Sequence, residues 1–489
     1  VATNGTIFLD ESGDAWPRPE LALVFTGEQE GYLEPCGCAG LENQLGGLKR
    51  RHTMLKQLAA KGWPLVALDA GGLVKRFGPQ AQIKYRHAVE SLITLGYAGV
   101  GLGTRDLRLD LIGPLIEFDE SQNPITSANV GFFGFDELFS RRYRVVEAGG
   151  KRVGFTTVLA DGEARRLGTN DDLTMVPVAE GLSTVAPQLA AENCDLQVLL
   201  VYGDAETAKD LARRYPQFDW VVSALGAQVP ALEARAIEGT SARLIEVGHK
   251  GQYAVVIGLY PNGQGGDADQ PFRYQKVPLD HRFDDSPEMQ AMLVRYQDEM
   301  QTLGLAALGA KPLPHPTQRE FAGSAACADC HYEEFEIWEN SRHWHATQSI
   351  VDLEPARHFD PECLSCHATG WEPQKYYPFV SGYLGLEQTA HLTANGCENC
   401  HGPAKRHADY MNGDLDLSEE EGDALTAALH MEIADNEGNQ EGQFFGSVVK
   451  SCMQCHDLDN SPDFDFQKYW PHVAHGSGAH GSGAHGSGG

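Results

Sequence analysis

The chain has 489 residues and a net charge of −30 at pH 7, from 38 lysines and arginines against 68 aspartates and glutamates. A chain of this length is too long for one hydrophobic core, so we expect at least two domains. The acidic balance argues against nucleic acid and anionic membranes as partners, because both require a basic face. It is compatible with a basic redox partner that the electrostatic field steers. No stretch reaches the roughly 20 consecutive apolar residues of a membrane-spanning helix, so we expect no transmembrane segment.

The residues after an N-terminal tail alternate short apolar runs with amphipathic segments, which predicts a layered α/β domain. Glycine-containing turns at 147–151 and 248–251 predict antiparallel hairpins, so the sheet is expected to be mixed. The predicted strands are 21–25, 64–68, 196–201 and 220–223, and the predicted helices are 48–61, 82–95 and 206–214.

Three landmarks of this domain resemble the metallophosphoesterase superfamily, in particular its 5'-nucleotidase and thiosulfohydrolase branch. Leu68-Asp-Ala-Gly-Gly72 stands where that family has an Asp-Ala-Gly-Asp metal loop. Gly101-Leu-Gly-Thr-Arg-Asp106 stands where it has Gly-Asn-His-Glu, and Val247-Gly-His-Lys-Gly-Gln-Tyr-Ala-Val-Val256 matches its late hairpin. The resemblance covers roughly residues 20 to 280 and implies a sandwich of sheets.

The metal-binding side chains of that family are mostly missing from this sequence. A two-metal site needs a bridging carboxylate and several imidazoles. We therefore predict a scaffold without phosphoesterase activity. The corresponding positions read Thr26-Gly-Glu-Gln29, Gly72, Thr104-Arg105, Tyr202-Gly-Asp204 and Ala224-Leu-Gly-Ala227.

The loop after the first strand contains two cysteines one residue apart, in Glu34-Pro-Cys36-Gly-Cys38-Ala-Gly40. Such a pair can chelate a soft metal ion such as copper or zinc, form a redox-active disulfide, or carry a sulfur substrate as a persulfide. The alternative is a structural disulfide with Cys194, which leaves one thiol over. Cys36 and Cys38 are thus a candidate redox or soft-metal site.

Residues 284–321 are predicted to connect two domains. A helix over 286–308 leads into Lys311-Pro-Leu-Pro-His-Pro316, and such a Pro-rich stretch favours extended backbone.

Eight of the 11 cysteines lie after this connection, in four pairs that each read Cys-x-x-Cys-His. This is the haem-attachment signature. Two thiols three positions apart can form thioethers to the two vinyl groups of one porphyrin, and the adjacent histidine reaches the iron as its proximal ligand. Four copies of the whole signature argue against zinc, which takes Cys and His in tetrahedral sets. We predict four covalent c-type haems, attached through Cys327, Cys330, Cys363, Cys366, Cys397, Cys400, Cys452 and Cys455, with His331, His367, His401 and His456 as proximal ligands.

The second axial ligands must come from elsewhere in the same segment. Methionine is scarce there, with only Met411, Met431 and Met453, so we expect mostly bis-histidine ligation. Bis-histidine iron has no open position, which favours electron transfer over substrate binding. The candidate distal ligands are His343, His345, His391, His407, His472 and His475, with His358 and His430 as weaker candidates.

Residues 322 to 475 resemble the cytochrome c-554 family of tetrahaem cytochromes, which accept electrons from hydroxylamine oxidation. The shared sequence motifs include Ser341-Arg-His343, Cys363-Leu-Ser-Cys-His-Ala-Thr-Gly370, Asn395-Gly-Cys-Glu-Asn-Cys-His-Gly-Pro403 and Tyr469-Trp-Pro-His-Val-Ala-His475. The resemblance implies His343, His407 and His475 as distal ligands, closely stacked haem pairs, and one five-coordinate haem in the founding members. Spacing does not indicate which haem would be open.

The chain is thus predicted to be an α+β multidomain protein. A layered α/β metallophosphoesterase-like sandwich is followed by a mostly α-helical, haem-packed tetrahaem cytochrome domain. An acidic insertion at 412–442 contains a predicted helix over 418–431, and the end of the chain is a low-complexity tail, either disordered or metal-binding through His475, His480 and His485. The predicted segments are 1–20, 21–283, 284–321, 322–475 and 476–489.

The function expected from the sequence is electron relay between redox proteins, with basic cytochromes as candidate partners and the α/β domain as a docking module. Because c-type haem is attached outside the cytoplasm, we expect export to the periplasm or the cell surface. One alternative is a redox enzyme that acts on a nitrogen or sulfur compound at an open haem or at the Cys36-Gly-Cys38 loop, with the haems as electron outlet. The other is a homo-oligomeric haem-chain filament.

Overall fold

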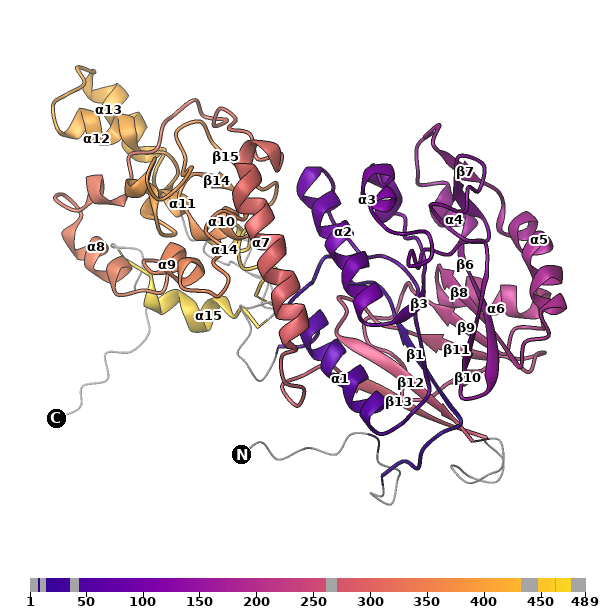
Figure 1. Ribbon diagram of the computed structural model, residues 1–489. Helices are drawn as coiled ribbons and strands as arrows, with labels where there is room; N and C mark the ends of the chain where they lie inside the picture. The colour runs from indigo at the N-terminus through magenta and orange to yellow at the C-terminus, as the bar shows by residue number, and fades with distance from the viewer. Residues whose placement is uncertain are drawn as a thin grey trace. The chain divides into compact units, whose positions relative to one another are not determined.

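A computed structural model describes residues 8, 15–35, 44–260, 271–431, 447–461 and 463–475 (Figure 1). The chain divides into two compact units, Val1–Tyr296 and Gln297–Gly489. Helix α7 (Pro287–Ala307) contains the point of division and is broken at Gly304, where φ is 72°. No helix in the described part of the chain is long and apolar enough to cross a bilayer.

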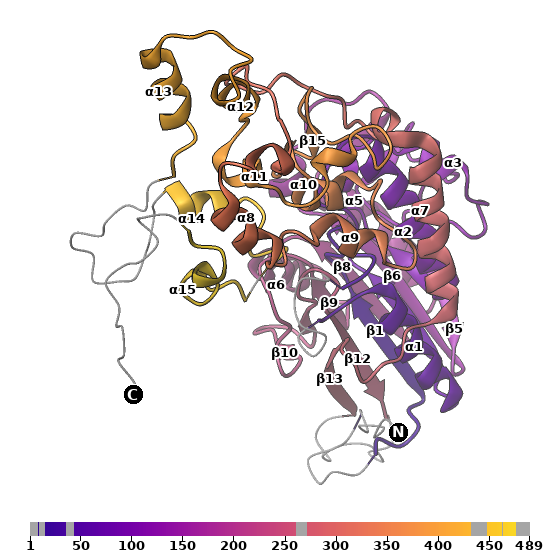
Figure 2. The same cartoon turned by 90° about the vertical axis from the view of Figure 1, so that its left-hand side faces the viewer.

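The first sheet of unit 1 has five strands in the order β13-β12-β1-β2-β3. Its three parallel strands are joined by helices α1 (Leu48–Ala60) and α2 (Pro79–Thr94), as parallel pairing requires a crossover. Strands β12 and β13 extend the sheet in antiparallel fashion, and they lie side by side in both views (Figures 1 and 2). The strands are β1 (Leu21–Thr26), β2 (Leu65–Asp69), β3 (Tyr97–Val100), β12 (Tyr253–Leu259) and β13 (Phe272–Pro278).

The second sheet has six strands in the order β10-β11-β9-β8-β6-β5. Its inner strands pair in parallel and both edge strands are antiparallel. Helices α5 (Val178–Ala191) and α6 (Ala205–Arg214) contribute to the apolar core on this sheet. The strands are β5 (Arg144–Ala148), β6 (Lys151–Leu159), β8 (Leu196–Tyr202), β9 (Trp220–Ser223), β10 (Arg235–Ala236) and β11 (Arg243–Glu246).

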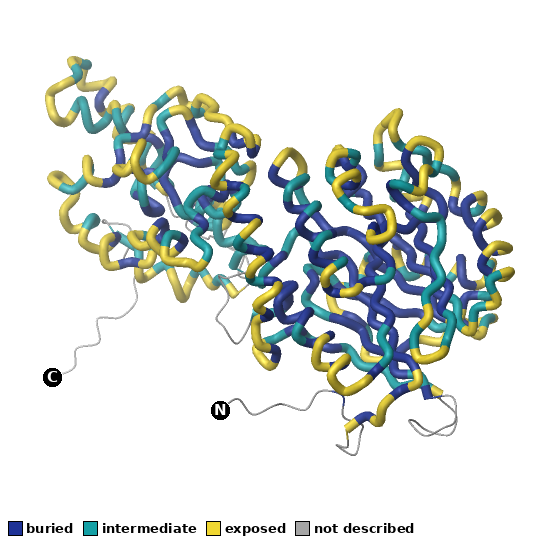
Figure 3. Tube along the Cα trace, in the orientation of Figure 1, coloured by how far each residue is buried: buried dark blue, intermediate teal, exposed yellow. Residues whose placement is uncertain are grey.

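The two sheets meet where Phe155 of β6 lies over Gly99 of β3. A Cβ at position 99 would come within 2.2 Å of the Phe155 ring, so this close approach requires glycine. The remaining elements of unit 1 are the short strands β4 (Val130–Phe132) and β7 (Leu173–Met175) and the short helices α3 (Ile112–Ile116) and α4 (Asp161–Ala164). Figure 3 shows a buried interior in this unit, which the central strands of both sheets form, whereas the edge strands β5, β10 and β13 are largely half-buried or exposed.

The layered architecture confirms the predicted fold class. The predicted mixed pairing is confirmed in both sheets, and residues 147–151 form the turn of the β5–β6 hairpin. The hairpin predicted at 248–251 is wrong, because this turn joins β11 of the second sheet to β12 of the first. Glycines at a turn specify the local reversal of the chain, whereas the pairing partner depends on which sheet each flanking strand enters.

The described residues of unit 2 form short helices and one small two-stranded sheet, β14 (Trp371–Glu372) and β15 (Tyr377–Pro378). An apolar cluster around Leu364, Trp371 and Tyr383 forms its core. Helix α13 begins with a capping box between Ser418 and Glu421. The helices are α8 (Tyr332–Glu339), α9 (Ala346–Val351), α10 (Pro361–His367), α11 (Cys397–His401), α12 (Lys405–Met411), α13 (Glu419–Ala427), α14 (Ser447–Cys452) and α15 (Phe466–Tyr469).

Candidate haem-binding site

The four Cys-x-x-Cys-His sequences lie on or directly after short helical turns of unit 2. The second motif forms the carboxyl-terminal part of α10, and the third motif forms the whole of α11. The first begins at the end of a 3₁₀ turn, Ser324–Cys327, and the fourth begins at the end of α14. All eight cysteines are free thiols. A helical turn places positions i and i+3 on one face, so each pair of thiols is presented to one side.

The thiols of different motifs come together. Cys327 of the first motif and Cys397 of the third share a hydrogen bond, which raises the pKa of Cys327 and lowers the pKa of Cys397. Cys455 of the fourth motif is hydrogen-bonded to Cys366 of the second, and this hydrogen bond raises the pKa of Cys455. Cys400 and Cys452 are near enough for the second thiol to raise the pKa of the first, after burial as the larger cause. The motifs therefore follow one another in space as first, third, fourth and second.

Two of the proximal histidines face a second imidazole. The ring centroids of His343 and His456 are 6.1 Å apart, and those of His401 and His475 are 5.7 Å apart. Two imidazoles on opposite sides of one metal, each with a metal–nitrogen bond of about 2 Å, would have centroids roughly 6 Å apart. Both pairs thus have a spacing that fits axial ligation of one iron.

His407 lies near His331 of the first motif. Burial lowers the pKa of His407, and the charge of His331 lowers it further. No second imidazole in the described residues is in ring contact with His367 or shifts its pKa. The structure therefore brings three of the six main distal candidates near proximal histidines, and the weaker candidate His430 near His401. It does not pair His345, His391 or His472 in this way within the described part.

Hydrogen bonds at Nδ1 orient several of these rings. Nδ1 of His367 lies 2.7 Å from the Ala346 carbonyl oxygen, and Nδ1 of His401 lies 2.8 Å from that of Leu429. A histidine that donates through Nδ1 leaves Nε2 free to bind a metal. Burial lowers the pKa of both rings, which favours the neutral form that a metal requires.

The same arrangement recurs at two further histidines. Nδ1 of His456 lies 3.1 Å from Ser461 Oγ, and Nδ1 of His475 lies 2.8 Å from the Val473 carbonyl oxygen. Free thiols, oriented imidazoles and paired rings together form a donor set that fits c-type haem. Sequence patterns identify the proximal histidines, but not these hydrogen bonds, because their partners are mostly backbone carbonyls.

A second polar cluster lies in unit 1, where β1, β2, β3 and β8 end. A Cβ at Gly72 would meet Glu28 Oε1 at 2.0 Å, so the Glu28 side chain fills the space that a side chain at position 72 would need. Burial raises the pKa of Glu28 to about 8. Asp106 accepts hydrogen bonds from the backbone N–H groups of Gly72, Val74 and Gly103. The Asp106 carboxyl group is therefore engaged by backbone hydrogen bonds, whereas Glu28 Oε1 is buried without a hydrogen-bond partner among the described residues.

Within the described residues, no three or more His, Cys, Asp or Glu side chains converge in a way that could hold a metal ion. Cys36 and Cys38 lie outside the described residues, as does the tail from 476 onwards. Cys194 is a free thiol that lies against Gly154, and burial raises its pKa. The interpretations of the Cys36-Gly-Cys38 loop, and the absence of phosphoesterase activity, remain predictions.

Residues 326–402 match the family model described as cytochrome c554 and c-prime. This part of the chain is cytochrome c554-like. Cytochrome c-554 of Nitrosomonas europaea is 29% identical over an alignment of 98 residues, and the match covers 17% of this chain and 39% of that protein. The cytochrome c554-like segment thus spans well under half of that relative's length.

Solved structures similar to this chain include a 5'-nucleotidase precursor from Thermus thermophilus, with a TM-score of 0.47 and 20% identity, over 62% of this chain and 61% of that one. The sulfate thiohydrolase SoxB of Thermus thermophilus has a TM-score of 0.45 and 13% identity, over 60% of this chain and 62% of that one. The chain therefore spans less than two thirds of each of these proteins.

Proposed function

We propose that this protein is an exported tetrahaem c-type cytochrome that relays electrons between redox proteins outside the cytoplasm. The observation that carries this proposal is the spacing of 6.1 and 5.7 Å in the imidazole pairs His343–His456 and His401–His475, each of which includes the histidine of a haem-attachment motif. Bound haem would supply one-electron chemistry at its iron. The chain's part is to hold each iron through oriented imidazoles and to fix the spacing between irons.

The proposed route for electrons follows the contacts between the thiols. Cys327 lies beside Cys397, Cys400 lies near Cys452, and Cys455 lies beside Cys366. Each of these contacts joins the attachment points of two motifs, so the haems bound there would be neighbours. Electrons would then pass along the first, third, fourth and second sites, or in the reverse order.

The second motif supports a redox-enzyme function as the alternative. Nδ1 of His367 is hydrogen-bonded to the Ala346 carbonyl oxygen, as expected of an iron ligand, but no second imidazole in the described residues is in ring contact with His367 or shifts its pKa. A five-coordinate iron at this site could bind a small nitrogen or sulfur compound. The Cys36-Gly-Cys38 loop remains a second proposed location for such chemistry, as a redox or soft-metal site, and no observation favours a filament.

Visible and EPR spectroscopy of the purified protein, with a haem count from intact mass, tests both functions. We expect four covalent haems, three of them low-spin and one high-spin, and we expect nitric oxide to bind only the high-spin one. Fewer than four haems would contradict the tetrahaem assignment. Four low-spin haems that bind neither nitric oxide nor cyanide would exclude the open site at the second motif.

Replacing single histidines tests the proposed ligand pairs. His475→Ala should convert one low-spin haem to high-spin, because His401 would lose its partner across the iron. His345→Ala is the matched control, since His345 is exposed and is in no ring contact with a proximal histidine of the described residues. Equal spectra for H475A and the wild-type protein would refute the pairing of His401 with His475.

A further inference from the structure

The third attachment motif, Cys397-Glu-Asn-Cys-His401, contains a buried carboxyl group that the proposed ligation does not use. Glu398 is 2% exposed. Its Oε1 accepts hydrogen bonds from the backbone N–H groups of Ala322 (2.9 Å) and Ala404 (2.7 Å). Its Oε2 accepts from Ala322 (3.1 Å) and Gly323 (2.7 Å). Both oxygens are therefore hydrogen-bond acceptors.

This pattern is that of an ionised carboxylate. A protonated carboxyl group would have to direct its O–H at one of these N–H donors, which cannot accept it. Burial raises the pKa of Glu398, and the N–H groups of Ala322, Ala404 and Gly323 oppose that effect. No lysine or arginine of the described residues forms an ion pair with it, and the nearby titratable group that also stabilises its charge is His391.

Glu398 connects the first and third motifs. Ala322 and Gly323 lie just before the first motif, and Ala404 follows the third. The charge of Glu398 acts on the thiols of both Cys327 and Cys397 in the direction that raises a thiol pKa, although the hydrogen bond with Cys327 leaves the pKa of Cys397 lowered overall. A charge in a low-dielectric interior acts more strongly on its neighbours than one exposed to water. The carboxylate is thus an internal charge shared by two attachment sites.

We propose that Glu398 is a fixed negative charge that lowers the reduction potentials of the haems at the first and third motifs relative to those at the fourth and second. The inference rests on the proposed attachment of haem at these motifs. A negative charge beside an iron disfavours the added electron of the reduced state, and nearby charge is one of the terms that set haem potentials. Glu398 acts through the haems as a tuning residue, and the resulting order of potentials directs electrons from the first and third sites towards the fourth and second.

Spectroelectrochemical titration of the intact protein and of Glu398→Gln at one pH tests this inference. We expect two of the four transitions to move to higher potential in E398Q. At a fixed potential the ratio of reduced to oxidised haem at these two sites should rise about tenfold, which corresponds to about 59 mV for a one-electron couple. Glu336→Gln is the matched control, because Glu336 is exposed on α8 beside the first motif, where water screens its charge. Glu398→Asp, which keeps the charge, should retain potentials close to those of the wild-type protein.

The possible results distinguish a failure of the proposed function from a failure of the role proposed for Glu398. A wild-type protein without four covalent haems would refute the proposed function, whatever the potentials. E398Q with four haems and unmoved potentials, or with an equal shift of all four, would refute the role of Glu398. If E398Q does not accumulate with four haems, site-assigned NMR titration of the wild-type protein decides. The two lowest potentials must then belong to the first and third sites, and any other assignment overturns the inference.

Discussion

Arg51 and Asp69 form an ion pair inside unit 1, and both side chains are fully buried. Arg51 Nη1 lies 3.7 Å from Asp69 Oδ2, and Thr26 Oγ1 donates to the same oxygen at 2.6 Å. Asp69 Oδ1 accepts from the backbone N–H of Gly71. The Arg51–Asp69 pair therefore fixes helix α1 against the ends of β1 and β2.

Removing one partner of this pair should be strongly destabilising. Arg51→Met leaves the carboxylate of Asp69 buried without its cation, and we expect the free energy of unfolding to fall by about 3–5 kcal/mol. Denaturant titration measures this loss. Lys56→Met is the control, because Lys56 pairs with Glu288 at the surface and should change stability far less. Equal effects of both variants would contradict the buried role of the Arg51–Asp69 pair.

Glu28 should make the stability of unit 1 depend on pH. The carboxyl group titrates near 4.5 when unfolded and at about 8 when folded, because burial disfavours its charge; the charged or titratable groups facing it are Tyr202, Glu30, Asp106 and Arg105. Between these pH values the folded state holds the extra proton. The contribution of Glu28 to the free energy of unfolding is therefore fully present at low pH. It falls as pH rises between these two values, on the order of 1 kcal/mol per pH unit.

Glu28→Gln should remove this dependence. The stability of E28Q relative to the wild-type protein should increase as pH rises from 4.5 towards about 8, and should then become constant. Scanning calorimetry at several pH values measures the difference. Glu233→Gln, at an exposed position, is the control and should run parallel to the wild-type protein. A constant difference between E28Q and the wild-type protein over this range would mean that Glu28 is already ionised.

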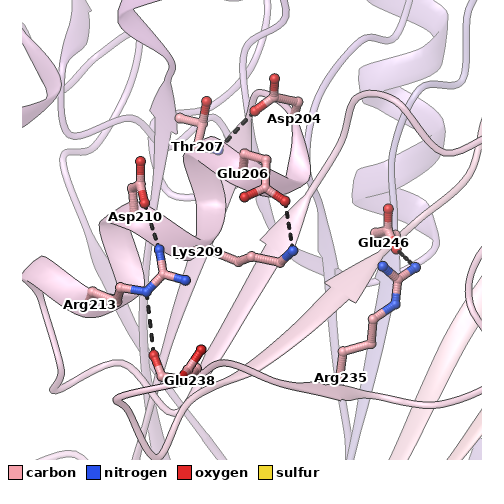
Figure 4. A network of polar contacts seen from close by, with 9 residues as sticks. All are labelled: Asp204, Glu206, Thr207, Lys209, Asp210, Arg213, Arg235, Glu238 and Glu246. Carbon is pink, nitrogen blue, oxygen red and sulfur yellow. Dashed lines mark hydrogen bonds and ion pairs between the residues drawn. The ribbon is translucent and has the colours of Figure 1, made fainter.

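At the scale of single elements, helix α6 shows how local sequence defines a boundary. Asp204 caps its first turn and accepts a hydrogen bond from the backbone N–H of Thr207 at 2.8 Å. Ion pairs three residues apart follow along its surface, Glu206–Lys209 and Asp210–Arg213 (Figure 4). The cap satisfies a backbone donor that the helix itself cannot, whereas the exposed pairs gain little in water.

The helix cap and the exposed ion pairs of α6 should therefore differ in how much they contribute to the free energy of unfolding. Asp204→Ala should reduce the free energy of unfolding by about 1 kcal/mol, because the N–H of Thr207 loses its acceptor. Asp210→Ala, which removes only the exposed pair with Arg213, should have a smaller effect. Denaturant titration of both variants makes the comparison. A larger loss in D210A than in D204A would contradict the capping role.

At the scale of the whole molecule, the net charge of −30 should govern encounters with redox partners. We expect reduction by a small basic cytochrome to slow by at least about tenfold from low to high ionic strength, since salt screens long-range steering. Stopped-flow kinetics at several salt concentrations measure this rate. Reduction by a neutral photoreduced flavin is the control and should not change. A rate with the basic cytochrome that salt leaves unchanged would contradict electrostatic steering.

The sequence by itself determined the features whose chemistry is local. The proposed thioether attachment and proximal ligation would each involve the same five consecutive residues, so the motifs at Cys327, Cys363, Cys397 and Cys452 could be recognised directly. The same is true of α1, α2, α6 and the central strands, where hydrophobic periodicity predicted the elements to within a few residues. The layered fold class followed from the order of these elements.

Only the tertiary structure decided which distant residues meet. It placed His343 opposite His456 and His401 opposite His475. It also brought Cys327 to Cys397 and connected Glu398 to the segment before the first motif. It also sent the chain from one sheet to the other at 248–251, where a hairpin was predicted. Contacts between residues far apart in sequence depend on how whole elements pack, and no local spacing encodes that packing.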